Sequence, residues 1–93
     1  MSQTLFNLLE AVNDEASFCA FAAALGAERA KAESLALTPD GFQGEWANNT
    51  IEGFLEAAVA WAKDSGFGMR PGPKPTNVWQ LAARFLWAGR NYE

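Results

Sequence analysis

The chain has 93 residues, of which 49% are hydrophobic, so it can build one modest core and is not intrinsically disordered. It contains no histidine, which excludes Ser-His and Cys-His nucleophiles and the usual zinc ligands. Its net charge is −4, with nine carboxylates against two cations in residues 1–60, and this acidic field disfavours nucleic acid and favours a basic partner.

The start of the chain predicts a short helix and no membrane segment. A leucine-rich pattern that ends at Val12 has helical spacing and favours a helix over residues 2–12. The first residues carry no positive charge, and the longest apolar run, residues 16–27, follows two carboxylates and is too short to cross a bilayer. We therefore expect a cytoplasmic protein without membrane contact.

Residues 15–34 predict a second helix, with Asp14 as its N-cap. Its expected inner face consists of Phe18, Phe21, Ala22 and Leu25. Gly26 costs about 1 kcal/mol relative to alanine in a helix interior, so a kink or an early end at this residue is open. Cys19 is the only cysteine, so it forms no internal disulfide, and we expect it to be a small buried apolar group. Two pairs are expected on the solvated surface: Glu28 with Lys31 and Arg29 with Glu33.

Residues 35–48 predict a loop, because Thr38-Pro39-Asp40-Gly41 has the composition of a tight turn. A short strand pair is the alternative, but the loop contains few β-branched residues. Two aromatic residues, Phe42 and Trp46, lie close in sequence to Asp40 and Glu45. Either these aromatic side chains cover the end of the helix bundle, or they form an aromatic anchor for a partner, with the two carboxylates at its rim.

Residues 50–65 predict a third helix, which Gly66 ends. Asn49 is the expected N-cap, and Glu52 has the spacing to complete a capping box. The expected buried stripe consists of Ile51, Phe54, Leu55, Ala58, Trp61 and Ala62. Glu52 and Glu56 lie one turn apart on a face that we expect to be wet, where they favour a basic partner over metal or catalysis.

Residues 66–75 predict a stiff Gly/Pro-rich connection, and a fourth helix follows from residue 76 or 77 to residue 92. Asn77 and Gln80 have capping-box spacing. This helix is apolar over much of its circumference, so it should lie centrally in the domain. Three tryptophans are expected in the core: Trp61, Trp79 and Trp87. Four cations form at most a small basic face: Arg70, Lys74, Arg84 and Arg90.

The segment from Trp46 to Trp61 carries a motif that resembles a family of short, functionally uncharacterised bacterial proteins. The motif has the form Trp46-x-Asn48-x-Thr50-Ile51-Glu52-x-Phe54-Leu55-Glu56-Ala57. The family pattern also has an Asp-x-x-Ser-Phe entry to a helix, here Asp14 to Phe18, and ends in Tyr92-Glu93. This chain departs from it in having Ile51 for leucine and in its Gly/Pro-rich stretch. The resemblance implies no catalytic residues; by analogy with small proteins encoded beside toxin genes, it suggests an immunity role.

Together these patterns predict one all-α domain over residues 1–93, a bundle of about four helices. We expect a non-enzymatic protein-binding domain without cofactor or metal, in particular an immunity or antitoxin-like inhibitor that covers the basic surface of a cytoplasm-acting toxin. The residues expected to bind the partner are Asp40, Phe42, Glu45, Trp46, Glu52 and Glu56. The alternative is a small self-associating structural or adaptor subunit, in which a homodimer buries the fourth helix.

Overall fold

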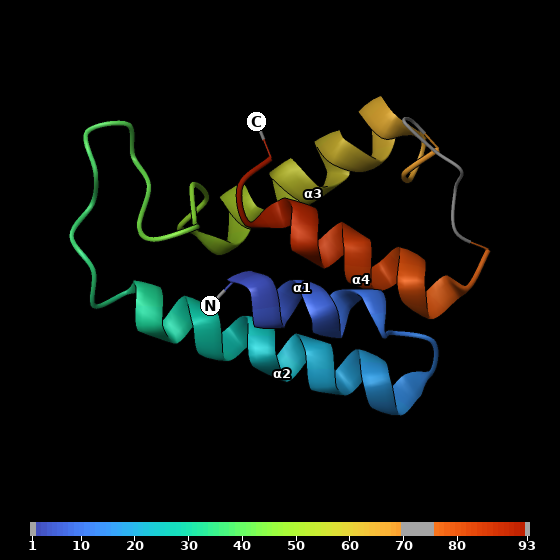
Figure 1. The fold of residues 1–93 in the computed structure, drawn as a ribbon. Helices are drawn as coiled ribbons and strands as arrows, with labels where there is room; N and C mark the ends of the chain where they lie inside the picture. Colours follow the sequence, from blue (N-terminus) through green and yellow to red (C-terminus); the bar gives the residue numbers. More distant parts are fainter. Residues whose placement is uncertain (1, 70–75, 93) are drawn as a thin grey trace.

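The computed structural model describes residues 2–69 and 76–92, which contain four α-helices (Figure 1). The helices are α1 (Ser2–Glu10), α2 (Glu15–Ala32), α3 (Ile51–Ser65) and α4 (Val78–Gly89). Within these residues there is no strand, only an isolated bridge between Gln43 and Trp46 in the loop before α3. The predicted all-α fold with four helices is confirmed.

The helices are shorter than their apolar patterns predict. α1 and α2 each end two residues early, because the chain closes each of them with a tight turn, as in the bond from the Val12 N–H to the Leu9 carbonyl. Val12 is nevertheless buried, so the apolar pattern continues beyond the end of α1, and its last residue still packs in the core. α2 continues through Gly26 without ending there.

Helix caps were predicted correctly at two of three N-termini. Asp14 caps α2 and forms a capping box with Ser17, and the Asn77 side chain accepts hydrogen bonds from the first turn of α4. The expected cap of α3 is wrong, because Thr50 Oγ1 accepts from the Gly53 N–H in place of Asn49. Asparagine and threonine both favour the N-cap position, so the residue types at 49 and 50 do not show which of the two precedes the first helical residue.

Gln80 has a different role from the predicted capping box. Its side-chain amide donates to the carbonyls of Leu9 and Val12, at 3.0 and 2.7 Å. Asn77 likewise donates to the Asn13 carbonyl. The start of α4 therefore donates to carbonyls in the last turn of α1 and in the turn that follows it.

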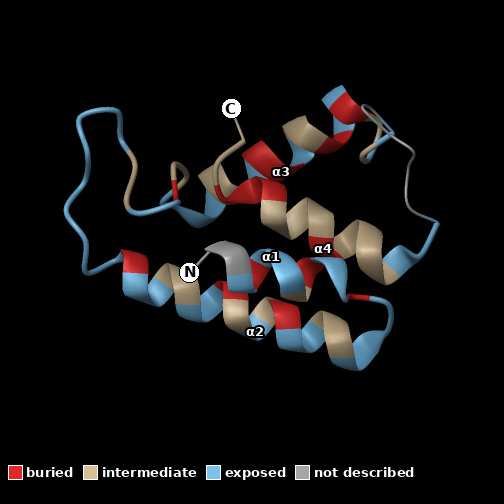
Figure 2. Cartoon of the chain, in the orientation of Figure 1, coloured by how far each residue is buried: buried red, intermediate tan, exposed pale blue. Residues whose placement is uncertain are grey.

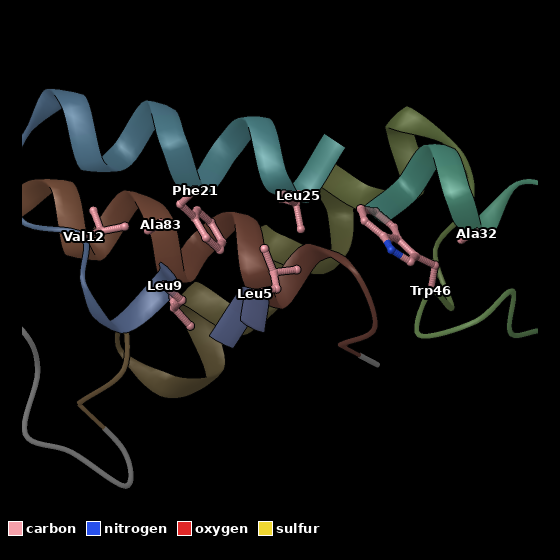
Figure 3. Packing of buried hydrophobic residues seen from close by; sticks show 8 residues of the cluster. All are labelled: Leu5, Leu9, Val12, Phe21, Leu25, Ala32, Trp46 and Ala83. Carbon is pink, nitrogen blue, oxygen red and sulfur yellow. The ribbon is translucent and has the colours of Figure 1, made fainter. Parts of the chain in front are cut away.

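α4 lies centrally, as its apolar circumference predicts. It packs against α1, α2 and α3, whereas α3 packs against no other described helix than α4 (Figure 1). The core lies between α1, α2 and α4 and contains Leu5, Leu9, Val12, Phe21, Leu25, Ala32, Trp46 and Ala83 (Figure 3). Within one chain, Ala83, Ala88 and Gly89 of α4 are buried, residues 79–82 and 84–87 are half-buried, and Val78 is exposed.

Small residues let α3 approach α4 closely. The buried residues of α3 are Ala57, Ala58, Ala62 and Ser65, and those at the end of α4 are Ala88 and Gly89; Figure 2 colours the buried residues of both helices red. A Cβ atom at Gly89 would lie 2.8 Å from Cε1 and 2.9 Å from the carbonyl oxygen of Phe54. Glycine is therefore required at residue 89 by close packing.

Several burial predictions are wrong. Cys19 is exposed, because it lies on the outer side of α2. Ile51 and Leu55, expected in the buried stripe of α3, are also exposed, since that helix has a single neighbour. Of the three tryptophans expected in the core, Trp79 and Trp87 are half-buried and pack against it, and Trp61 is half-buried outside that cluster.

Candidate functional site

The six residues predicted to bind a partner do not form one surface. The four carboxylates are exposed: Asp40 and Glu45 in the loop, Glu52 and Glu56 on α3. Phe42 is half-buried, in a turn where its backbone bonds to Thr38, whose hydroxyl also donates to Asp40. Trp46 exposes only 4% of its surface.

Trp46 belongs to the core, the first of the two alternatives for the loop aromatics. Its ring stacks on Phe54 with centroids 5.8 Å apart, and the Arg29 guanidinium lies 5.5 Å from the ring centroid. Its indole N–H donates to the Glu28 carboxylate at 2.9 Å. A side chain that is packed and hydrogen-bonded in this way is not available to a partner, so Trp46 leaves the candidate surface.

Sequence reasoning missed an ion pair between Glu28 and Arg90. The Arg90 guanidinium lies 2.9 Å from Glu28 Oε1, and the two side chains are 4% and 15% exposed. Arg90 also lies 4.0 Å from the centroid of the Trp87 ring. The expected surface pairing of Glu28 with Lys31 is wrong. One signal was present in the sequence: Glu28 continues the buried series of Phe21 and Leu25 at helical spacing.

The small basic face expected from the C-terminal cations is also not formed as predicted. Arg90 is buried and Arg84 is half-buried, with its Nε atom inside the protein. Arg70 and Lys74 lie outside the described residues. The Arg29–Glu33 pair is present, at 4.0 Å.

The outer face of α3 is the clearest candidate for binding. Ile51, Leu55 and Val59 follow one another at four-residue spacing and are 78%, 46% and 42% exposed. Glu52 and Glu56 are exposed beside them. An open depression on this face is lined by Leu55, Glu56, Val59, Ala60, Lys63 and Asp64. We refer to Ile51, Leu55 and Val59 as the α3 stripe.

Among the described residues, the pKa values of two groups are clearly shifted, one at the start of α2 and one beside Asp64, at the edge of the depression on α3. Hydrogen bonds from the Ser17 backbone N–H and hydroxyl hold the pKa of the Asp14 carboxyl below its usual value. The hydrogen bond to Asp64 raises the pKa of the Tyr92 hydroxyl. Both shifts follow from local hydrogen bonds and stabilise helix packing or capping.

Two further properties concern the described part of the chain, residues 2–69 and 76–92. No three His, Cys, Asp or Glu side chains cluster there in a way that could hold a metal ion. None of the four helices combines the length and the apolar character needed to cross a bilayer.

In comparisons with known proteins, the chain matches no protein-family model, no curated protein and no solved structure. The resemblance of the Trp46–Trp61 segment to a bacterial family stays a prediction.

Proposed function

We propose that this protein is a non-enzymatic protein-binding domain that recognises its partner through the α3 stripe. The observation that carries the proposal is the exposure of Ile51, Leu55 and Val59 in one row on a helix with a single helical neighbour. Three adjacent aliphatic side chains in water are unfavourable, and burying them against a partner removes that cost.

The negative charge around the α3 stripe indicates what kind of surface the partner would have. Glu52 and Glu56 lie beside the α3 stripe, and residues 1–60 carry a balance of −7. A partner surface with an apolar centre and lysine or arginine at its rim complements this arrangement. The specific role that we propose is inhibition of a cytoplasm-acting bacterial toxin, such as a nuclease, whose basic surface the domain covers.

Copurification with the product of the neighbouring gene tests this role. We expect wild-type protein to retain a partner that Leu55→Asp loses. Leu37→Asp is the matched control, because Leu37 is also exposed but lies in the loop before α3. A partner that both variants retain, or a protein that stays a lone monomer, contradicts the proposal.

Association kinetics test the role of charge. Replacing Glu52 and Glu56 by glutamine should slow association, mostly at low salt, because charge steers the encounter more than it holds the complex. An association rate that is unchanged at low ionic strength would show that these carboxylates are only a solvated surface.

A second candidate is self-association through the same face, and one observation favours it. Lys63 continues the four-residue series of the α3 stripe, on the helix whose first two turns carry Glu52 and Glu56. In an antiparallel pair of α3 helices, Lys63 of each copy would therefore lie opposite the acidic half of the other. Sedimentation separates the candidates: a tight dimer at micromolar concentration that Lys63→Glu dissociates supports self-association.

A further inference from the structure

A cavity of about 380 Å³ opens between α2 and the start of α3. It exists because these two helices, in the part of the chain described, do not pack against each other. Its apolar wall includes Leu25, Trp46 and Phe54, and its polar rim includes Arg29 and Asn49. The volume lies within the range of small-molecule sites, and apolar walls with few polar groups are typical of them.

Arg29 places a fixed positive charge at this cavity. Its guanidinium donates to Asn49 Oδ1 at 3.0 Å and to Gln43 Oε1 at 2.7 Å, and it lies over the ring of Trp46. Both acceptors are neutral amides, so they orient the guanidinium without neutralising it. The side chain of Arg29 is 22% exposed, which leaves it accessible from the cavity.

Glu33 is the charged group that faces Arg29, and it is a weak partner. Its carboxylate lies 4.0 Å from the guanidinium, and its side chain is 71% exposed. An exposed pair at this distance contributes little. A carboxylate brought by a ligand would therefore replace Glu33 at small cost.

Gly26 is a second, independent sign that the cavity has a role. It lines the cavity from the middle of α2, where glycine is a poor helix former. A Cβ atom at this residue would meet no atom within 4 Å, so packing does not require glycine there. A poor helix former in the middle of a helix, without a packing reason, is typical of functional positions. Here the lack of a side chain at Gly26 leaves the cavity open.

We propose that this cavity binds a small organic carboxylate with an aromatic or branched apolar body. The apolar body would contact Leu25, Trp46 and Phe54, and the carboxylate would pair with Arg29 in place of Glu33. The N-terminus of α3, whose first residue Ile51 also lines the cavity, adds the positive end of the helix dipole. The cavity adjoins the α3 stripe at Ile51, but the proposal does not rest on the protein-binding role, because its test needs no protein partner and changes no residue of the stripe.

Titration of the full-length, ¹⁵N-labelled chain with phenylacetate tests the proposal, with phenylacetamide as the uncharged analogue of the same shape. We expect saturable shifts at the Gly26 amide and the Trp46 indole N–H. Phenylacetate should bind at least about fivefold more tightly than the amide, because the charge-assisted bond to Arg29 is the stronger one. Shifts that do not saturate, that spread over the surface, or that are equal for acid and amide overturn the proposal.

Three variants sharpen the test. Arg29→Gln should remove the preference for the acid, and Glu33→Gln should strengthen binding of phenylacetate about two- to fivefold because it removes the competing carboxylate. Glu10→Gln, at the end of α1, changes the net charge by the same amount as Glu33→Gln and should leave binding unchanged. A gain with Glu10→Gln as large as with Glu33→Gln would show a general charge effect and overturn the site.

Gly26→Leu should fill the cavity and abolish binding of both probes. The thermal unfolding midpoint of this variant shows whether it is folded, and Gly26→Ala, which adds one carbon, provides a milder form of the same change. Undiminished binding by a folded Gly26→Leu protein would place the ligand elsewhere and refute the proposal.

Discussion

The Glu28 carboxylate lies 2.9 Å from the Arg90 guanidinium and joins the last turns of α2 to the end of α4. The same carboxylate oxygen accepts the indole N–H of Trp46, so one atom connects two helices and the loop before α3. Because both charged side chains are largely buried, removing one partner leaves the other without compensation.

Arg90→Met should therefore lower the free energy of unfolding by about 3 kcal/mol. Adding Glu28→Gln to Arg90→Met should recover part of this loss, because it removes the unpaired buried charge and still offers an oxygen to Trp46. Urea unfolding of the single and double variants measures this coupling. Losses that simply add would show that the two side chains do not interact.

Trp46→Ala should destabilise the protein by about 4 kcal/mol, because it removes a buried indole from the core. Trp46→Phe retains an aromatic ring against Phe54 but removes the donor to Glu28, so a loss of about 1 to 2 kcal/mol is expected. Thermal and urea unfolding check both values. A loss below about 1 kcal/mol for Trp46→Ala would contradict its place in the core and return it to the candidate surface.

Two glycine-to-alanine changes should have opposite effects on the free energy of unfolding. Gly89→Ala should destabilise by about 1 to 3 kcal/mol, since the new Cβ would overlap Phe54. Gly26→Ala should stabilise by up to about 1 kcal/mol, because alanine is the better helix former and space is available. Chemical unfolding of the two variants gives a matched comparison; equal shifts would mean that α3 and α4 are not in close contact at Gly89.

The Asp14 cap predicts a dependence on pH. Its pKa is lower in the folded protein than the ordinary value of 3.8, because its carboxylate accepts bonds from the Ser17 N–H and hydroxyl. The stabilisation is therefore fully present above the unfolded-state pKa and is lost as pH falls through the folded-state pKa. Asp14→Ala should lower the thermal midpoint at pH 7 and have a much smaller effect near pH 2.5. An equal effect at both values would show that the charged cap does not stabilise α2.

The features of the fold that depend on residues close together in the sequence could be predicted. Asp14, Asn77 and Gly66 end or begin helices through contacts within one turn, and each was identified. Burial along α3 could not be predicted in the same way. A periodic apolar pattern marks a face that can be buried, but whether Ile51 and Leu55 are covered depends on how many helices pack around α3.

The contacts that exclude Trp46 from the candidate surface were not predicted, because they join distant parts of the chain. Trp46 meets Glu28 across 18 residues, and Glu28 meets Arg90 across 62. Several carboxylates and cations could form such pairs, and no spacing rule selects among them. The exposed positions of Glu52 and Glu56 were predictable because they follow from the helix register alone.

The attachment of α3 through a single helix has a consequence for amide hydrogen exchange. Detaching α3 would separate Phe54 from Trp46 and Gly89 and uncover the small residues of α3, while the leucines and Phe21 between α1, α2 and α4 stay covered. Such an opening costs less than unfolding the whole chain, because it uncovers only part of the buried apolar surface. Amides of α3 are thus expected to exchange with solvent through a partial opening and to lose protection before those of α2. A partner that binds the α3 stripe would slow this exchange selectively.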